Sequence, residues 1–263
     1  MSERFAPRIG AVFSADIAVP EHEREVSFYS RVLRTGEDPL WRDDLMSNLG
    51  VPIVGLGQQS PAYGDLPLQW MPHIQVADVA ASAQRAQDLG GAVLLHQKSG
   101  DGTSEWAVLR DPAGAAFGII PLVPAAPPDS ATAGAGANGS VGCIAWLDLT
   151  VPDAATVRDF YRHVVGWTVQ DLAMQDGDGG YTDFIMLDGN GNPAAGVCHA
   201  RGTNVDLPPV WMIYLPVGDL AESIRLVEQD GGTVIKAQRG ANGEYVYAAI
   251  RDPVGATLAL MPG

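Results

Sequence analysis

The sequence predicts an α+β fold built from two tandem copies of one domain. Three stretches of the first half return in the second: Trp70–Gly91 as Trp211–Gly232, Arg110–Pro121 as Arg251–Pro262, and Ala15–Tyr29 as Leu147–Tyr161. The first two pairs are 141 positions apart and the third pair is 132 apart, so one segment of the N-terminal copy is nine residues shorter, where a loop can absorb the difference.

A second repeat lies inside the copies. Three stretches begin with valine, any residue and aspartate and end at a glycine: Val76–Gly91, Val151–Gly166 and Val217–Gly232. In each, an apolar strand pattern leads into an amphipathic helix pattern, and several short strand patterns follow. Asp78, Asp153 and Asp219 suit the N-cap position because a carboxylate accepts hydrogen bonds from the free amides at a helix start. The sequence therefore predicts repeated modules of strand, capped helix and short strands.

The domain boundaries follow from composition. The 263 residues suffice for two domains that can each bury a core. We expect an N-terminal domain over 8–122 and a C-terminal domain over 142–263. Between them, residues 123–141 are rich in Pro, Ala, Gly and Ser and almost lack large apolar side chains, which is typical of a linker.

The overall charge limits the partners. With 16 basic against 31 acidic residues, the formal charge of −15 argues against nucleic acid and against anionic membrane surfaces. No continuous apolar run at the start indicates a signal peptide or a membrane span, so we expect a cytoplasmic protein. Cys143 and Cys198 are too few and too isolated to predict a disulfide framework or a zinc site.

None of the common catalytic motifs is present, neither a Walker loop nor a dinucleotide glycine fingerprint, a G-x-S-x-G elbow or H-E-x-x-H. A site would therefore have to be assembled from strands. The elements that do recur are the V-x-D cap, a Phe-Tyr pair on the first helix of each copy, a Gly-Gly pair before a strand, and D-P-x-G before the last strand.

These elements resemble the vicinal oxygen chelate superfamily, which includes glyoxalase I, extradiol dioxygenases, fosfomycin-resistance proteins and bleomycin-binding proteins. The resemblance covers both halves. Trp146–Leu149 together with Asp111–Gly118 resembles one branch in particular, tandem glyoxalase-like proteins often labelled hydroxylase or antigen and often found in natural-product gene clusters. The resemblance implies two domains of paired βαβββ modules, each domain forming a cup-shaped sheet around a ligand.

The family's metal positions are changed in this sequence. The resemblance places a His or Gln ligand five residues before the strand valine and a Glu ligand seven residues after the Asp of D-P-x-G. These positions hold Ser14, Met71, Trp146 and Met212, and then Gly118 and Ala259. None is a good ligand for a hard divalent ion. We therefore expect no metal and no cofactor.

Strand alternation indicates what replaces the metal. Residues two apart on a strand share a face, so Asp16, His73, Asp148 and Tyr214 should point into the predicted cups. The candidate catalytic pairs are Asp16 with His73 and Asp148 with Tyr214, because a carboxylate beside a proton-active group supports acid–base chemistry. Alternatively, the two aspartates only accept hydrogen bonds that fix the fold.

Apolar and aromatic side chains should line the rest of the cups. The candidate ligand-binding residues are Ser14, Met71, Trp106, Trp146, His199, Met212 and Tyr247. For Trp70 and Trp211, which recur before equivalent strands, core packing is the favoured interpretation.

The leading functional hypothesis is a metal-independent protein that acts on an apolar, aromatic or polyketide-like natural product. As an enzyme it would be a lyase or isomerase type, using proton transfer for isomerisation, cyclisation or dehydration. The alternatives are a ligand-sequestering resistance protein and a metal-dependent glyoxalase- or dioxygenase-like enzyme. The sequence leaves open whether the chain is a monomer with internal pseudo-symmetry or a homodimer.

Overall fold

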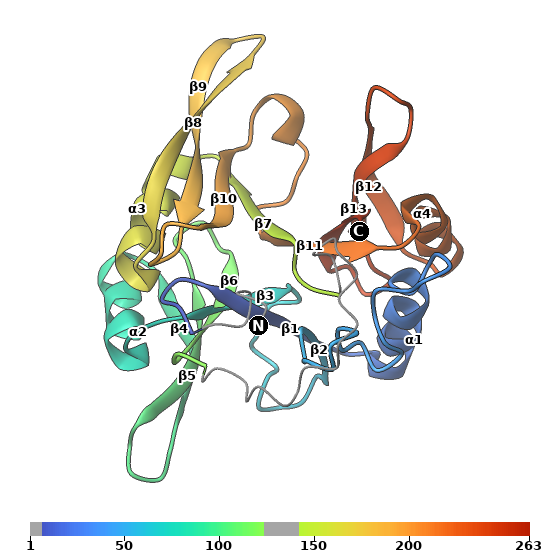
Figure 1. Cartoon of the computed structure of the whole chain (residues 1–263). Coiled ribbons are helices and arrows are strands. Elements are labelled where there is room, and N and C mark those ends of the chain that lie inside the picture. The colour runs from blue at the N-terminus through green and yellow to red at the C-terminus, as the bar shows by residue number, and fades with distance from the viewer. Residues whose placement is uncertain (1–6, 124–141) are drawn as a thin grey trace. The chain divides into compact units, whose positions relative to one another are not determined.

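The computed structural model describes residues 7–123 and 142–263, so nearly all of the predicted linker lies outside the described residues (Figure 1). The chain divides into two compact units, and each unit combines parts of both sequence copies. Unit 1 contains described residues 7–13, 71–123 and 147–211, and unit 2 contains 14–70, 142–146 and 212–263. The domain boundaries expected from the repeat therefore mark sequence copies rather than these compact units, and as domain limits they stay a prediction.

Unit 1 joins the second module of the N-terminal copy to the first module of the C-terminal copy. The first of these consists of β3 (Met71–Gln75), α2 (Val79–Asp88), β4 (Ala92–Lys98), β5 (Ser104–Arg110) and β6 (Ala116–Ile120), with strand order β3-β6-β5-β4. The other consists of β7 (Trp146–Val151), α3 (Ala154–Val165), β8 (Thr168–Asp176), β9 (Gly179–Leu187) and β10 (Pro193–His199), with strand order β7-β10-β9-β8. In both, the first and last strands pair in parallel and the remaining pairs are antiparallel.

Unit 2 joins the first module of the chain to the last. The first module has β1 (Val12–Val19), α1 (His22–Val32) and β2 (Val54–Gln58), with β1 and β2 parallel. The last has β11 (Trp211–Val217), α4 (Leu220–Gln229), β12 (Thr233–Arg239), β13 (Tyr245–Arg251) and β14 (Thr257–Pro262), in the order β12-β13-β14-β11. A 3-10 turn, η3 (Gly202–Asn204), belongs to unit 1 and precedes β11. Each unit combines helices with strands, and the sheets stay open and do not close into barrels. The predicted α+β class is therefore confirmed.

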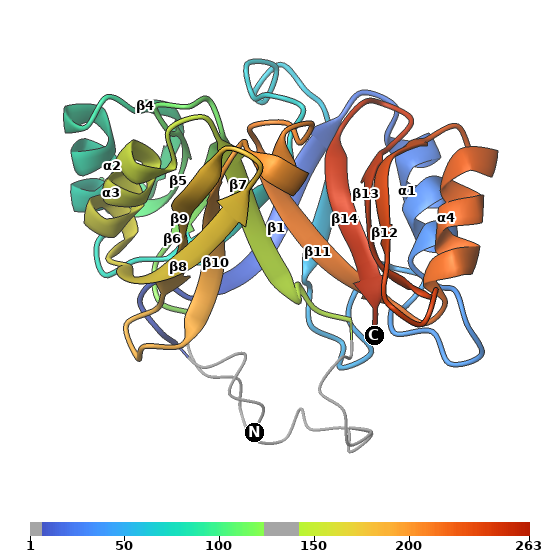
Figure 2. The same ribbon diagram turned by 90° about the horizontal axis from the view of Figure 1, so that it is seen from above.

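Three helices begin as the sequence predicts. The side chains of Asp78, Asp153 and Asp219 each accept a hydrogen bond from the backbone N–H three residues further on. The fourth helix, α1, follows Glu21, whose side chain makes no capping bond. Within the units the helices pack in pairs, α2 with α3 and α1 with α4 (Figure 2). None of the described helices is both long and apolar enough to span a membrane.

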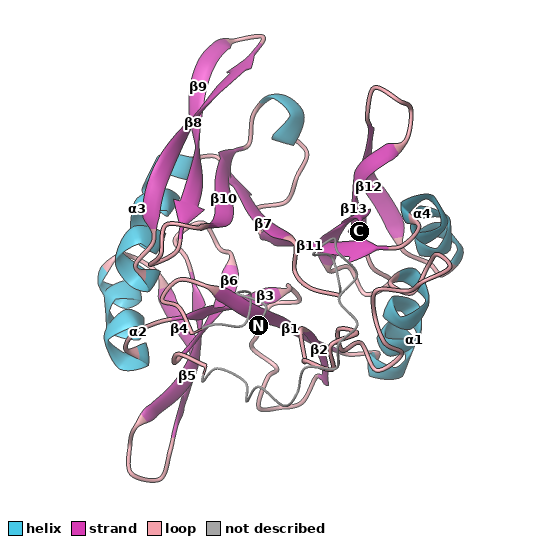
Figure 3. Ribbon diagram, in the orientation of Figure 1, coloured by secondary structure: helices cyan, strands magenta, loops and turns pink. Residues whose placement is uncertain are grey.

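The first module is shorter than the βαβββ pattern. Between α1 and β2 the chain makes only isolated bridges, Trp41 with Ser47 and Met46 with Pro52. The corresponding part of the third module is the long β8–β9 hairpin (Figure 3). The nine-residue difference between the copies therefore corresponds to a hairpin that the N-terminal copy lacks, and not only to a shorter loop.

A buried network repeats in the two cores. Tyr161 Oη donates to Asp111 Oδ2 over 3.1 Å, and Trp211 Nε1 donates to Tyr161 Oη over 2.8 Å. Unit 2 repeats this arrangement with Tyr29, Asp252 and Trp70. The expectation that Trp70 and Trp211 are core residues is confirmed, since they are 1% and 0% exposed. Each network links a tyrosine of one sequence copy to the D-P-x-G aspartate of the other, so both copies are needed to complete each core.

Candidate functional site

A carboxylate lies across a glycine on the surface of the β7–β10 pair in unit 1. Asp148 on β7 is the register partner of Gly196 on β10. A Cβ atom built at Gly196 would overlap Asp148 Oδ1 and would lie 3.5 Å from Cys198 Sγ. The absence of a side chain at position 196 therefore leaves room for the carboxylate beside the thiol.

The neighbouring thiol stays protonated. Burial raises the pKa of Cys198 well above its usual value, and the negative charges of Asp148 and Asp183 raise it further. Because the thiolate is the reactive form of cysteine, Cys198 is not set up as a nucleophile.

The second carboxylate, Asp183 on β9, holds His199 at the end of β10. Asp183 Oδ1 accepts the backbone N–H of His199 over 2.7 Å and lies 3.1 Å from His199 Nδ1. A carboxylate oxygen at this distance favours the proton on Nδ1, which leaves Nε2 as the proton acceptor. The side chain of Asp183 is 2% exposed and that of His199 is 21% exposed, so the imidazole remains accessible while its partner is buried.

Aromatic and cationic groups surround the imidazole. The ring centroids of Tyr181 and Phe184 lie 5.9 and 6.2 Å from that of His199. The guanidinium of Arg201 lies 4.6 Å from the Tyr181 ring centroid and makes two bonds of 3.0 Å to Asp176. Phe184 is buried, whereas Tyr181 and Arg201 are partly exposed, so a flat ligand can stack against these two side chains. We call Asp148, Asp183, Cys198 and His199, with these neighbours, the Asp183–His199 site.

Two other predicted catalytic residues, Asp16 and His73, each lie beside a glycine. In unit 2, a Cβ at Gly55 on β2 would overlap the carboxylate of Asp16 on β1. In unit 1, a Cβ at Gly118 on β6 would overlap the ring of His73 on β3. The fourth, Tyr214 on β11, pairs with Ala259 instead. The predicted pairs Asp16 with His73 and Asp148 with Tyr214 each have one member in each unit, so their joint action stays a prediction.

The predicted ligand-binding residues differ in exposure. Tyr247 lies beside Tyr214, with ring centroids 6.1 Å apart. Met71 and Met212 are buried, whereas Ser14, Trp106 and Trp146 are partly buried. Their roles as ligand contacts stay predictions.

The residues at the family's metal positions do not fit a divalent ion. Gly118 and Ala259 offer no side-chain donor, and space beside Gly118 is taken by the imidazole of His73. Over the two described ranges, no cluster of three or more His, Cys, Asp or Glu side chains is placed to hold a metal. Since a divalent ion needs several converging N or O donors, these positions do not form a site for one.

Sequence reasoning missed Asp183. It lies in the strand Gly179–Leu187, among the mainly apolar residues of "YTDFIML", and a lone acidic residue in such a strand is a signal of a buried, partnered carboxylate. Which base it would hold could not be predicted, because that depends on the pairing of β9 with β10.

Both halves of the chain match known families. Residues 13–120 match a family model described as a glyoxalase-like domain, and residues 143–260 match that of the glyoxalase/bleomycin resistance protein/dioxygenase superfamily. The chain is thus a tandem glyoxalase-like protein. It belongs to the glyoxalase/bleomycin resistance protein/dioxygenase superfamily, the vicinal oxygen chelate proteins that the motifs resemble.

Among characterised sequences, the chain is 27% identical over 200 residues to the anthracycline biosynthesis protein DauV of Streptomyces sp. (strain C5), covering 74% of this chain and 66% of the relative. It is 27% identical over 169 residues to the anthracycline biosynthesis protein DnrV of Streptomyces peucetius, covering 64% of this chain and 57% of the relative. The chain therefore spans less than two thirds of the length of each.

Two solved structures share the fold. One is the 2,3-dioxygenase LapB from Pseudomonas sp. KL28, with a TM-score of 0.55 at 14% identity, covering 98% of this chain and 93% of that one. The other is a mutant of 4-hydroxymandelate synthase from Streptomyces coelicolor, with a TM-score of 0.51 at 12% identity, covering 97% and 93%. At such low identity these similarities establish the fold alone.

Proposed function

We propose that this protein acts on an aromatic, polyketide-like natural product by moving protons, without a metal. The relatives named as anthracycline biosynthesis proteins support the ligand class, since anthracyclines are polycyclic and aromatic. The aromatic and guanidinium surface around His199 suits such a flat molecule.

The observation that carries the catalytic part is the hydrogen bonding of Asp183 to His199. With the proton held on Nδ1, Nε2 of His199 takes a proton from a carbon next to a ligand carbonyl, and the C–H electron pair moves into the enolate. Asp183 stabilises the imidazolium that forms. Return of the proton to a different atom completes an isomerisation.

Other groups have supporting roles in the proposal. Asp148 lies beside Gly196 and near Cys198 on the neighbouring strand, and we propose it as a second carboxylate for a further proton transfer. Asp16, His73 and Tyr214 remain proposed proton-active groups, because they occupy the corresponding strand positions in the other modules.

A second candidate function is sequestration of the same kind of ligand. The observation that favours it is the Arg201–Tyr181–Asp176 arrangement, in which the guanidinium is fixed over the ring by two hydrogen bonds. A rigid stacking surface binds a flat ligand without any chemistry.

Proton exchange separates the two candidates. The protein, dialysed against a chelator, is incubated in D₂O with a panel of anthraquinone and anthracycline aglycones, and deuterium uptake is followed by mass spectrometry with binding followed by fluorescence. We expect catalysed uptake that falls about 100-fold or more in His199→Gln and Asp183→Asn, with binding retained. His163→Gln, an exposed histidine on α3, is the matched control and should behave as wild type.

The outcomes are distinct. Binding without exchange would support sequestration and refute the catalytic proposal. Exchange that only the undialysed protein catalyses, and that one added metal ion restores to the dialysed protein, would refute metal independence.

A further inference from the structure

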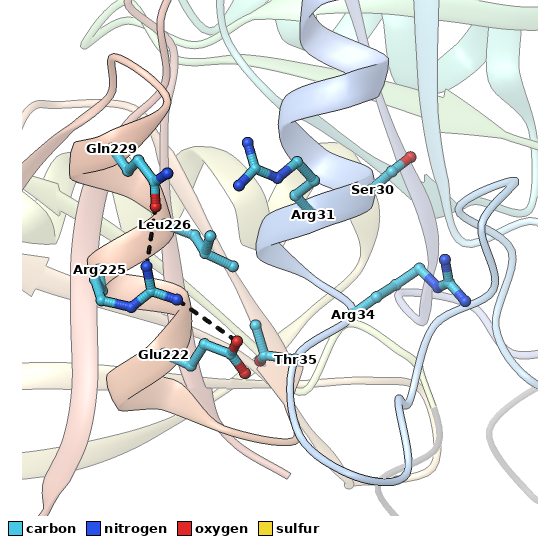
Figure 4. A pocket seen from close by; sticks show the side chains of 8 residues that line it. All are labelled: Ser30, Arg31, Arg34, Thr35, Glu222, Arg225, Leu226 and Gln229. Atoms are coloured by element: carbon cyan, nitrogen blue, oxygen red, sulfur yellow. Dashed lines mark hydrogen bonds and ion pairs between the residues drawn. The ribbon is translucent and has the colours of Figure 1, made fainter.

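A polar groove lies between α1 and α4 in unit 2, and its lining residues include none of the Asp183–His199 site. Its volume is about 520 Å³, and it is open to solvent (Figure 4). Its lining residues come from the end of α1 and from one face of α4: Ser30, Arg31, Arg34, Thr35, Glu222, Arg225, Leu226 and Gln229. Neither the family nor the proposed function assigns a role to this groove.

Three arginines line this groove, although the whole chain has only 16 basic residues against 31 acidic ones. Arg31 extends from α1 toward α4, where Arg225 lies (Figure 4). Positive charges that line one groove repel one another, and an anion bound between them offsets that repulsion.

The hydrogen bonds and ion pairs of Arg31 and Arg225 use only some of the N–H groups of each guanidinium. Arg31 Nη1 binds Asp230 Oδ1 at 2.6 Å. Arg225 Nη1 donates to Gln229 Oε1 over 2.9 Å, and Arg225 Nη2 lies 3.7 Å from Glu222 Oε1. Both arginine side chains are about half exposed or more, where ion pairs contribute little. Because a guanidinium has five N–H donors, both can bind a further acceptor.

The equivalent groove of unit 1 is filled. At an offset of 141 positions, Arg85 on α2 corresponds to Leu226 on α4. Arg85 Nε donates to His163 O over 2.7 Å, and its Nη2 donates to Val164 O over 3.3 Å and to Ser82 Oγ over 2.6 Å. The side chain thus crosses from α2 to the end of α3. Leucine cannot make this bridge, so the substitution opens the groove in unit 2.

We propose that the groove between α1 and α4 binds an oxyanion, specifically a phosphate group, between Arg31 and Arg225. The planar N–H forks of two guanidinium groups match the oxygens of phosphate, which accept paired hydrogen bonds. The phosphate is either inorganic or part of a small organic phosphomonoester, and both present the same oxygens to the arginines.

Inorganic phosphate and phenyl phosphate are the probes. Binding to the full chain is measured by titration calorimetry at low ionic strength, where surface electrostatics are least screened. We expect saturable 1:1 binding that weakens with added salt. Tighter binding of phenyl phosphate would assign the site to an organic phosphate, and equal binding would assign it to the free ion.

Leu226→Arg is the decisive variant because it copies the Arg85 bridge of unit 1. If the groove is the site, this variant loses binding at least about tenfold although it adds a positive charge. If phosphate only responds to local positive charge, the variant binds as well or better, and the proposal is overturned.

Two further variants secure the result. Arg31→Gln with Arg225→Gln should also lose at least about tenfold in affinity, and this double variant carries the test if Leu226→Arg does not fold. Arg162→Gln, an exposed arginine on α3 of unit 1, should bind as wild type. Absence of saturable binding to the wild-type protein overturns the proposal.

Discussion

Tyr29 Oη donates a 2.7 Å hydrogen bond to Oδ2 of Asp252, a residue 223 positions later in the chain. The other oxygen, Oδ1, accepts three backbone N–H groups of the D-P-x-G turn, from Val254, Gly255 and Ala256. Burial raises the pKa of the Asp252 carboxyl, and these hydrogen bonds act against that rise. The tyrosine therefore supports the turn that precedes the last strand of the protein.

Removing this hydroxyl should destabilise the fold. Tyr29→Phe leaves a buried carboxylate oxygen without its donor, and we expect a loss of about 1–3 kcal/mol in the free energy of unfolding. Urea denaturation measures it, with the exposed Tyr63→Phe as the control. Tyr161→Phe in unit 1 should behave in the same way. A change below about 0.5 kcal/mol would mean that the bond is not formed in solution.

Replacing Glu25 should have the opposite effect. Glu25 is fully buried on α1, where no described group donates a hydrogen bond to its ionised carboxylate and the Asp252 carboxyl is its neighbour. The equivalent position in the C-terminal copy, at the offset of 132, is Val157. We expect Glu25→Val to raise the free energy of unfolding by about 1–3 kcal/mol near pH 8, because it removes an unsatisfied buried group.

The pH dependence of stability tests the cause. Burial raises the pKa of Glu25 to about 8 from an ordinary 4.5, and the charges of Asp252 and Glu21 add to this while Arg24 opposes it. The folded state then holds a proton that the unfolded state releases, so this group lowers stability as pH rises from 4.5 to about 8. Glu25→Val should remove that slope, and Glu23→Gln on the exposed side of α1 should keep it. An unchanged slope in Glu25→Val would assign the pH dependence to another group.

Much of the fold could be predicted because local signals and the repeat agree. Asp78, Asp153 and Asp219 could be assigned as helix caps from their positions alone, and the structure confirms all three. Long-range pairing carries no such local signal. Tyr29 belongs to the Phe-Tyr pair that recurs in both copies, but the identity of its partner, Asp252, depends on how the copies combine into units.

The candidate site could be predicted only in part, for a similar reason. Strand alternation placed Asp148 and His73 on one face of their strands, yet the glycine beside each is visible only once the strand register is known. His199 was a candidate ligand contact, but Asp183, which orients it, lies on a different strand.

The glycine beside Asp148 provides a test of the site. In Gly196→Ala the added Cβ would overlap Asp148 Oδ1, so the carboxylate must move away from Cys198. We expect ligand affinity or turnover to fall about tenfold or more, while the far-ultraviolet circular dichroism stays native. Gly57→Ala is the control, because its nearest neighbour, the backbone oxygen of Ile17, is 3.7 Å from the new Cβ. If both variants retain full activity, the position of Asp148 is not important for the reaction.

The two sequence copies should be unable to fold separately as monomers. A fragment of residues 7–122 contains Tyr29 without Asp252 and Asp111 without Tyr161, and a fragment of residues 142–263 has the converse gaps. Separating the fragments also removes α4 from α1 and α3 from α2. Two molecules of the same fragment can fill these gaps, since Asp111 and Asp252 are repeat equivalents. We therefore expect each fragment alone to aggregate or form a homodimer, and the coexpressed fragments to form a 1:1 complex.

Size-exclusion chromatography with light scattering distinguishes these species. Tyr29→Phe in one fragment should weaken the 1:1 complex about fivefold or more, since the hydrogen bond then spans two molecules. Tyr63→Phe should leave it intact, because this tyrosine is exposed. A stable monomer of either fragment with native-like circular dichroism would show that each sequence copy completes its own core, which contradicts the buried links between Tyr29 and Asp252 and between Tyr161 and Asp111.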